Sequence, residues 1–383
     1  MDKRIRIGLR YTYNENWIGG TYYLENLIKA LNTLKDNEKP EIIAIVNNHK
    51  DFFLLKKNTS YPFLKFQIHS GEKNAFYRLI NRVSKKLFRK TIFSQEIKNL
   101  DAIFPYSKLK QYNLAKKKIY WIPDFQEHFI PSLFSEQEIT KRRTWQEEIV
   151  YSKNNLILSS DDAYSNLKNI YPTFKVSAHI IPFAVSLPSI DEISELKINE
   201  PYNIPDEYLI CCNQFWPHKN HLIILKAIKR VKENKKNVLV LFTGKTSGSY
   251  GTNPYYEKLI KFVIDNNLKE NIKFLGFVDR SLQLKLLLNA KAIIQPSLFE
   301  GWSTIVEDSK ALNKELIVSD IHIHKEQLKG YDTIYFSPNN EVELAESIEF
   351  ILERKTTSKK EKLGYEKNVV LFAKKFIQVI KQH

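Results

Sequence analysis

The sequence has few cysteines, few glycines and no long apolar run. Its two cysteines, Cys211 and Cys212, are adjacent, and strand alternation would send their side chains to opposite faces, which is typical of small core residues in a reducing cytosol. No stretch of about 18 apolar residues occurs, which excludes a membrane-spanning helix. The start of the chain also lacks the apolar run of a signal peptide. We therefore expect a cytoplasmic globular protein.

Charge of one sign is in excess, because the formal net charge is +16 at pH 7. Such an excess indicates an acidic partner, which could be nucleic acid, anionic lipid or a phosphorylated substrate. The chain is also rich in Lys, Ile and Asn, as an AT-rich genome would encode. This composition would explain the positive charge without any partner. RNP, KH and zinc-finger signatures are absent, so we expect no nucleic-acid partner.

Length and pattern predict two domains, since 383 residues exceed what one hydrophobic core usually spans. Apolar runs that read as strands alternate with helical stretches in the first half at 5–9, 41–46, 101–106, 118–123 and 155–160. The alternation begins again with expected strands at 208–215, 237–243, 271–278, 292–298 and 315–319. The predicted division is a first domain (1–188), a linker (189–206), a second domain (207–360) and a C-terminal helix (361–383).

This βα alternation predicts an α/β protein with two doubly wound, mostly parallel sheets. The C-terminal helix has apolar positions that could pack on either domain. Ligands of such sheets bind beyond the carboxyl ends of the strands. The loops that lead from strands into helices are therefore where we look for chemistry.

One such loop lies in SLFEGWSTIVEDSKAL (297–312). Thr304 followed three residues later by Glu307 matches a capping box, which predicts that the helix starts at Thr304 and gives Glu307 a structural task.

The same loop places Glu300 before the turn and Asp308 after it. Between them, free amides of Ser303 and Thr304 at a helix N-terminus would attract phosphate. The pattern predicts a cradle for an anion, flanked by carboxylates suited to sugar hydroxyls. Acidic residues also favour the first turn of any helix, which is a purely structural explanation.

A second loop lies in CNQFWPHKNH (212–221). Lys219 stands at the expected helix start, where its charge opposes the helix dipole unless an anion is bound. His218 and His221 form H-x-x-H without an acidic or cysteine partner, which is weak evidence for a metal. We favour a phosphate clamp and predict no metal site.

A third loop, ENWIGG, ends in Gly19 and Gly20 close to the first strand. The pair allows the backbone to approach a ligand ahead of a helix, although it could equally form a turn. It is not G-x-G-x-x-G, so the nicotinamide fingerprint is missing.

Together these segments resemble the retaining GT-B glycosyltransferases of family 4, in particular a branch with EGWSTxVED and FWxHKNH motifs. The resemblance spans essentially the whole chain. It implies two Rossmann-like domains that face each other across a cleft, with the C-terminal helix crossing back to the N-terminal domain. The family's E-x7-E motif is matched by Glu300 and Asp308, with Asp in the second place.

The resemblance also implies roles for the residues of the first loop. Glu300 would lie at the donor sugar and act in catalysis. Asp308 would hold the ribose hydroxyls, although its side chain is one methylene shorter than Glu. The turn containing Gly301, Ser303 and Thr304 would hold the pyrophosphate.

Other positions match the family pattern in part. Lys219 corresponds to the lysine of the phosphate clamp, whereas Gln214 stands where an arginine is usual, so one positive charge is missing. Gly19 and Gly20 correspond to the N-terminal glycine pair at the donor.

Two further donor contacts follow from the resemblance. The main chain around Phe277 and Val278 would read the base. The segment WIPDFQEHF offers Asp124 and His128 as candidate catalytic residues, although a loop histidine is often an ordinary surface residue.

The resemblance implies a metal-independent enzyme that needs no cofactor, and no D-x-D triplet occurs in the chain. It would transfer a hexosyl unit, with retention, from a nucleotide-diphosphate sugar to a hydroxyl of a glycan or lipid-linked glycan. Surface polysaccharide synthesis (O-antigen, capsule or lipopolysaccharide) is the expected setting. Two alternatives stay open: a nucleotide-sugar 2-epimerase of the same fold, and a non-enzymatic binder of polyanions or membrane surfaces.

A basic segment, FYRLINRVSKKLFRKTIF (76–93), has one apolar helical face surrounded by arginines and lysines. Such a helix can lie on an anionic membrane, which would put the protein on the inner face of the cytoplasmic membrane and favour a lipid-linked acceptor. The same pattern also fits a helix that packs on a sheet and exposes its charges to solvent.

Overall fold

The computed structural model describes residues 4–68, 99–107, 115–196, 204–247, 253–354 and 364–382. The basic segment 76–93 lies outside the described residues, so its two interpretations both stay predictions. In the described part of the chain, no helix is long and apolar enough to cross a membrane.

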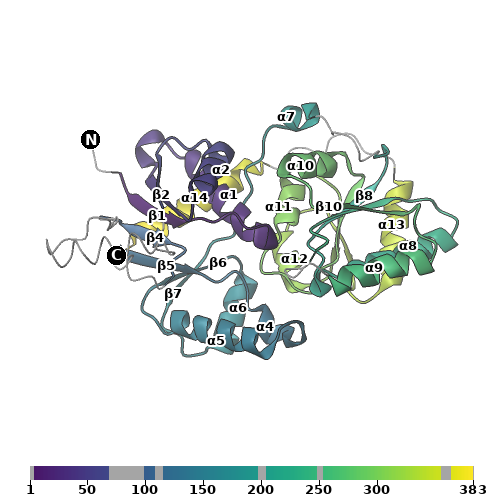
Figure 1. Ribbon diagram of the computed structural model, residues 1–383, viewed down its shortest axis with the longest axis horizontal. Coiled ribbons are helices and arrows are strands. Elements are labelled where there is room, and N and C mark those ends of the chain that lie inside the picture. The colour runs from purple at the N-terminus through teal and green to yellow at the C-terminus, as the bar shows by residue number, and fades with distance from the viewer. Residues whose placement is uncertain are drawn as a thin grey trace, which may run out of the picture.

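The first sheet is parallel and has seven strands in the order β3-β2-β1-β4-β5-β6-β7 (Figure 1). Its strands are β1 (Arg6–Arg10), β2 (Glu41–Val46), β3 (Leu64–Ile68), β4 (Ala102–Phe104), β5 (Lys117–Trp121), β6 (Asn155–Leu158) and β7 (Ser177–Ile180). The helices of this domain are α1 (Ile18–Asn32), α2 (His49–Thr59), α4 (Gln126–Phe129), α5 (Glu136–Val150) and α6 (Asp161–Ile170). A short 3-10 turn, η1 (Glu15–Trp17), precedes α1.

The second sheet is also parallel, in the order β10-β9-β8-β11-β12-β13. Its strands are β8 (Leu209–Cys212), β9 (Val240–Thr243), β10 (Ile272–Gly276), β11 (Ala292–Gln295), β12 (Leu316–Ser319) and β13 (Ile334–Phe336). The helical elements are α7 (Ile190–Glu195), η5 (Pro217–Lys219), α8 (His221–Glu233), α9 (Pro254–Asp265), α10 (Arg280–Asn289), α11 (Thr304–Ala311), α12 (His322–Gln327) and α13 (Glu341–Glu353).

The prediction of two doubly wound α/β domains is therefore confirmed, with differences in detail. The strand expected at 208–215 is shorter and ends at Cys212, and the edge strands β3, β7 and β13 were not predicted. Edge strands such as β3 alternate buried and exposed positions less regularly than central ones, so their apolar signal is weak. The predicted linker contains α7, which a capping box at Ser189 starts.

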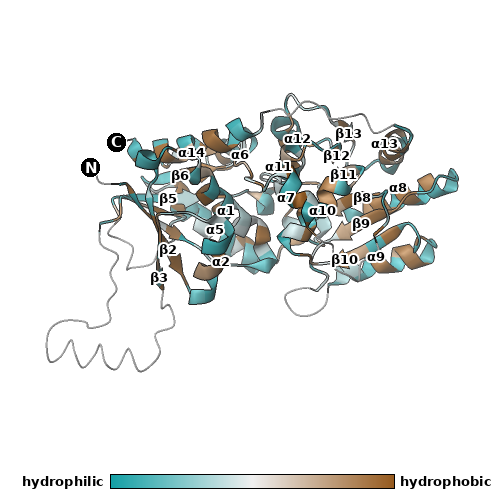
Figure 2. Cartoon of the chain, turned by 90° about the horizontal axis from the view of Figure 1, so that it is seen from above, coloured by the Kyte–Doolittle hydropathy of each residue, from teal (hydrophilic) through white to brown (hydrophobic). Residues whose placement is uncertain are grey.

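Burial explains why the central strands read as continuous apolar runs. All residues of β8, β9, β11 and β12 are buried, because helices cover both faces of the sheet (Figure 2). Cys211 packs in the core cluster with α8, whereas Cys212 packs in the cluster with α10 and α11 on the other face. The prediction that they lie on opposite faces is therefore confirmed. Both cysteines are free.

The C-terminal helix α14 (Glu366–Lys381) returns to the first domain and lies beside α1 (Figure 1). Its residues Phe372, Ala373 and Phe376 are fully buried in the core cluster that α1 and the first sheet share. Its apolar side therefore packs on the N-terminal domain, and the implied crossing is confirmed.

Candidate active site

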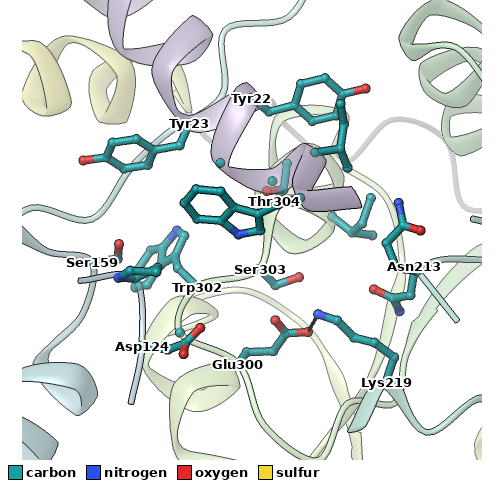
Figure 3. A pocket seen from close by; sticks show the side chains of 18 of the residues that line it. Tyr22, Tyr23, Asp124, Ser159, Asn213, Lys219, Glu300, Trp302, Ser303 and Thr304 are labelled. Atoms are coloured by element: carbon teal, nitrogen blue, oxygen red, sulfur yellow. Dashed lines mark hydrogen bonds and ion pairs between the residues drawn. The ribbon is translucent and has the colours of Figure 1, made fainter. Parts of the chain in front are cut away.

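A pocket opens between the two domains, where the strands of both sheets end. The N-terminal side is formed by η1, the start of α1 and the loop after β5; the C-terminal side is formed by the loops after β8 and β11 (Figure 3). Nine predicted site residues line it: Gly19, Gly20, Asp124, Gln214, Lys219, Glu300, Gly301, Ser303 and Thr304. The fold thus brings together residues from loops almost 300 positions apart.

Glu300 and Lys219 form an ion pair on the C-terminal side of the pocket (Figure 3). Oε1 of Glu300 accepts hydrogen bonds from Lys219 Nζ at 2.6 Å, Ser297 Oγ at 2.7 Å and Gln295 Nε2 at 2.8 Å. All three bonds use the same oxygen, and among the described residues none is recorded to Oε2. The Glu300 carboxylate therefore has one oxygen held rigidly and one available to a ligand.

Electrostatics keep this carboxylate ionised although it is 8% exposed. Burial raises its pKa, but Lys219 and the Ser297 hydroxyl favour the anion more strongly, so the pKa of Glu300 lies below its usual value. The pair therefore offers a pocket-facing ammonium beside a carboxylate.

Asp124 approaches from the N-terminal domain, in the loop after β5. Burial raises the pKa of its carboxyl, against a hydrogen bond from the Gln126 amide and the charge of Arg142. The environments of Asp124 and Glu300 thus push their pKa values in opposite directions, an arrangement often found where one group gives and another accepts protons.

Gly301 lies where the two domains touch. A Cβ at this position would stand 2.2 Å from the carbonyl oxygen of Pro123 and 2.9 Å from Cβ of Asp124. In addition, Ser160 Oγ donates to the Gly301 carbonyl at 3.3 Å, across the domain boundary. The glycine of the EGW motif is therefore needed for close approach of the domains.

The helix α11 begins at Thr304, as predicted, but its capping differs from the prediction. Ser303, not Thr304, is the N-cap, and its Oγ accepts from the Val306 amide. Glu307 does not cap the helix, because its buried carboxylate binds Lys310 at 2.8 Å and Tyr365 at 2.5 Å. The Thr304–Glu307 capping box was wrong, since donors from other parts of the fold take the Glu307 side chain.

The sequence predicts a free amide at Ser303, but this amide is hydrogen-bonded within the protein. It donates to Oε1 of Gln327 at 3.1 Å, and Gln327 Nε2 returns a bond to the Ser303 carbonyl at 2.8 Å. Thr304, the first residue of α11, has an amide with no acceptor inside the helix. Of the two amides predicted to bind an anion, that of Thr304 remains without an acceptor in the helix, while Ser303 is held by Gln327 of α12.

Four predicted site residues lie outside the pocket lining. Asp308 is fully buried and binds Arg280 through both carboxylate oxygens. His128 turns toward Gln146, with 3.0 Å between Nε2 and Oε1. Val278 is buried in the core of the second domain, and Phe277, the remaining member of the four, lies beside it.

Gln214, which replaces the usual arginine, joins the domains. Its Oε1 accepts from the Lys245 amide at 3.0 Å, and its Nε2 donates to the Glu15 carbonyl at 3.3 Å. Lys245 Nζ donates to Asn16 Oδ1 at 2.9 Å. These bonds hold η1 of the first domain against the second.

Sequence reasoning missed the aromatic side of the pocket. Trp17 stacks on Trp121 with ring centroids 5.4 Å apart, and Trp121 stacks on Tyr23 at 4.1 Å. We call these three residues the aromatic wall. Trp17 also packs on Gly20, where a Cβ would lie 2.7 Å from the indole. Trp17 itself remains 47% exposed. Trp17 lies just before the glycine pair in the sequence, but a tryptophan at such a position does not by itself indicate a pocket residue.

The two histidines of H-x-x-H, His218 and His221, are both buried. Burial lowers the pKa of His218 and of His221 to about 3, so both are neutral. Across the described ranges, no group of three or more His, Cys, Asp or Glu side chains could hold a metal ion.

A family model matches the C-terminal part of the chain. Residues 194–369 match the family model of glycosyl transferases group 1. The segment includes η5, the EGW loop and α11, so it carries Lys219, Glu300 and their partners.

Two curated relatives are bacterial glycosyltransferases. The O-antigen chain mannosyltransferase RfbU of Salmonella typhimurium is 27% identical over 229 residues, which are 60% of this chain and 59% of that protein. The N-acetylgalactosamine-N,N'-diacetylbacillosaminyl-diphospho-undecaprenol 4-alpha-N-acetylgalactosaminyltransferase of Campylobacter jejuni is 23% identical over 210 residues, which are 54% of this chain and 53% of that protein. The matches thus span only a little more than half of each relative's length.

Solved structures resemble the chain over its whole described fold. A glycosyltransferase from Rickettsia africae aligns with a TM-score of 0.64 at 16% identity, covering 100% of this chain and 98% of that one. Anabaena HepE, solved in complex with UDP and glucose, aligns with a TM-score of 0.63 at 14% identity, covering 98% and 95%. The two domains together have the GT-B fold.

Proposed function

We propose that this protein is a glycosyltransferase that moves a hexosyl unit from a nucleotide-diphosphate sugar to a hydroxyl of a glycan or lipid-linked glycan. The observation that carries the proposal is the Lys219–Glu300 pair, which faces a pocket between two doubly wound domains. The match of this segment to glycosyl transferases group 1 supports it.

Lys219 would stabilise the leaving diphosphate. The bond that breaks joins the anomeric carbon to a phosphate oxygen, so negative charge develops on the diphosphate as the sugar departs. Lys219 and the Thr304 amide offer positive potential on the same side of the pocket. With this electrostatic support, we propose that the reaction needs no divalent metal and no other cofactor.

Glu300 would orient the donor sugar. Oε1 is fixed by three hydrogen bonds, and Oε2 can accept a bond from a sugar hydroxyl. Asp124, on the opposite domain, would contact the reacting end of the acceptor or donor once the domains close.

We propose that the reaction retains the anomeric configuration by attack from the face that the diphosphate leaves. The acceptor oxygen bonds to the anomeric carbon while the carbon–phosphate oxygen bond breaks. The proton of the acceptor hydroxyl passes to the departing phosphate oxygen, so the reaction needs no separate base. Both Asp124 and Glu300 serve binding and electrostatics in this scheme and form no covalent intermediate.

The relatives suggest the setting. The name of one curated relative describes an O-antigen chain mannosyltransferase, and the name of the other includes a diphospho-undecaprenol-linked saccharide. We propose the same class of acceptor here, reached on the inner face of the cytoplasmic membrane. The +16 net charge would favour that anionic surface.

The first experiment measures thermal stabilisation by UDP, GDP, ADP, dTDP and CMP. A ligand at 100 times its dissociation constant should add about 2.7 kcal/mol to the free energy of unfolding. We expect one nucleoside diphosphate to raise the melting temperature of the wild-type protein and Lys219→Ala to lose most of that shift.

Lys261→Ala is the matched control, because Lys261 pairs with Asp265 on exposed α9 far from the pocket lining. It should retain the nucleotide shift. If none of the five nucleotides stabilises the wild type, the glycosyltransferase proposal fails. If Lys261→Ala loses the shift as fully as Lys219→Ala, the assigned phosphate site is wrong. Incubation of the protein with the nucleotide sugar alone would reveal a 2-epimerase by its product.

A further inference from the structure

Asp308 is held in a closed ion pair. Its side chain is fully buried, and its two oxygens bind Nη1 and Nη2 of Arg280, with 2.6 Å between Oδ2 and Nη1. The carboxylate keeps further lone pairs, but Asp308 is fully buried, so these lone pairs are not exposed to ligand hydroxyls. Asp308 also lies outside the pocket lining.

Arg280 connects this buried pair to the pocket. Its Nη1 also donates to Oε1 of Gln283 at 2.8 Å, and Gln283 lines the pocket. The two residues are three positions apart on α10, so they share one helix face. From the other domain, Tyr22 of α1 covers the guanidinium, with 4.9 Å between Cζ and the ring centroid.

The contacts determine which end of Gln283 can meet a ligand. A glutamine amide has one acceptor oxygen and an NH₂ group that donates two hydrogen bonds. Because Arg280 engages the oxygen and the Cys212 sulfur accepts one hydrogen of the NH₂ group, the second NH₂ hydrogen is the donor left for the pocket. A neutral donor suits an oxygen of a ribose or a base, whereas the diphosphate is better matched by Lys219.

We propose that Gln283 contacts the nucleoside part of the bound nucleotide and that Asp308 is a positioning residue, which acts through Arg280. Asp308 fixes the guanidinium, the guanidinium fixes the Gln283 oxygen, and the Gln283 NH₂ group donates to a ribose or base oxygen. This inference rests on the proposed function, because it requires a nucleotide in the pocket.

The test is a double-mutant cycle on nucleotide affinity, measured by calorimetry with the nucleoside diphosphate that stabilises the wild type. We expect Gln283→Leu and Asp308→Asn each to raise the dissociation constant about tenfold, the loss of about one hydrogen bond. Because both act through the same amide, Asp308→Asn should have little further effect in the Gln283→Leu background.

Gln283→Glu sharpens the assignment. It keeps an oxygen for Arg280 but removes the NH₂ donor, so affinity should fall as in Gln283→Leu while the melting temperature of the free protein is preserved. If Asp308→Asn does not fold, Arg280→Lys takes its place in the cycle, since lysine keeps a positive charge for Asp308 but lacks the planar fork that binds Asp308 and Gln283 together.

Each outcome decides the matter. Additive losses in the cycle would mean that Asp308 touches the nucleotide directly, which overturns the inference and leaves the proposed function intact. Unchanged affinity in Gln283→Leu would also overturn it. A wild type that binds no nucleotide overturns both proposals together.

Discussion

The two sides of the pocket are built by different physical means. On the C-terminal side, Lys219 and Glu300 are held by charge and by hydrogen bonds from Ser297 and Gln295. On the N-terminal side, the aromatic wall is held by ring stacking and by contact with Gly20. Charged residues at strand ends are unusual enough to be found by motif, whereas Trp and Tyr also build ordinary cores and give no comparable signal.

The difference also suggests a division of labour. Fixed charges are suited to a diphosphate, whose position must be controlled during bond breaking. A flat, half-exposed indole is suited to the apolar face of a sugar or lipid-linked glycan, which requires area more than charge. Substitutions at three places test this difference: the domain contact, the buried hydrogen bonds just before α14, and the aromatic wall.

Gly301→Ala should have the largest effect, because it acts where the two sides meet. A methyl group would lie 2.2 Å from the Pro123 carbonyl oxygen, so the domains must separate. Overpacking of this kind costs about 1–3 kcal/mol, which corresponds to about a 5- to 150-fold loss of the closed form. Transfer activity should fall accordingly, and small-angle scattering should show a larger radius of gyration.

Gly19→Ala is the control for domain arrangement, since a Cβ there meets nothing within 4 Å. It should leave the radius of gyration unchanged. Normal activity and scattering in Gly301→Ala would show that the domains do not need this contact.

Tyr365→Phe should have an intermediate effect on stability. Tyr365 lies just before α14; its hydroxyl donates to Glu307 Oε2 at 2.5 Å and accepts from the Val185 amide at 2.9 Å. Its loss leaves a buried amide and a buried carboxylate oxygen each short of a partner, at a cost of about 1–3 kcal/mol. Urea unfolding should report the change.

Tyr151→Phe serves as its control, because Tyr151 is 45% exposed and surface changes stay within about 0.5 kcal/mol. Equal midpoints for Tyr365→Phe and the wild type would show that the link from Glu307 to the segment before α14 does not contribute to stability.

Trp17→Ala should have the smallest effect on stability and a selective effect on function. It removes one stacked pair, worth about 0.5–1.5 kcal/mol, from a residue that is already half exposed. We expect the KM for the acceptor glycan to rise while nucleotide affinity stays unchanged. Steady-state kinetics with varied acceptor, and calorimetry with the nucleotide, separate the two.

Trp145→Ala is matched to it, because Trp145 is 39% exposed on α5 and does not line the pocket. It should change neither quantity. If Trp17→Ala weakens nucleotide binding instead, the aromatic wall belongs to the donor and the proposed division of labour is wrong.

Much of the fold followed from pattern. The central strands could be found because helices cover both of their faces, which makes nearly every residue apolar. The loops of Lys219 and Glu300 could be found because parallel sheets bind ligands at strand ends. The edge strands β3, β7 and β13 were not found, since partial exposure weakens their apolar pattern.

The capping-box error at α11 and the closed Asp308–Arg280 pair share one cause, which is that partners outside the local motif bind these side chains. Glu307 matches a capping box by spacing, yet Lys310, Gln327 and Tyr365 take its oxygens. Asp308 matches a ribose ligand by spacing, yet Arg280, 28 residues earlier, takes both of its oxygens. Spacing along the chain reports which groups share a turn but not which buried donors reach them.

The order of amino acids was thus sufficient to specify two parallel sheets, an α/β class of protein and a charged loop at the end of each relevant strand, because periodicity and residue type act locally. The choice of hydrogen-bond partners, the aromatic wall and the need for glycine at 301 arose when two domains met. Those features depend on which groups are buried against each other, and the packing of the folded chain decides this.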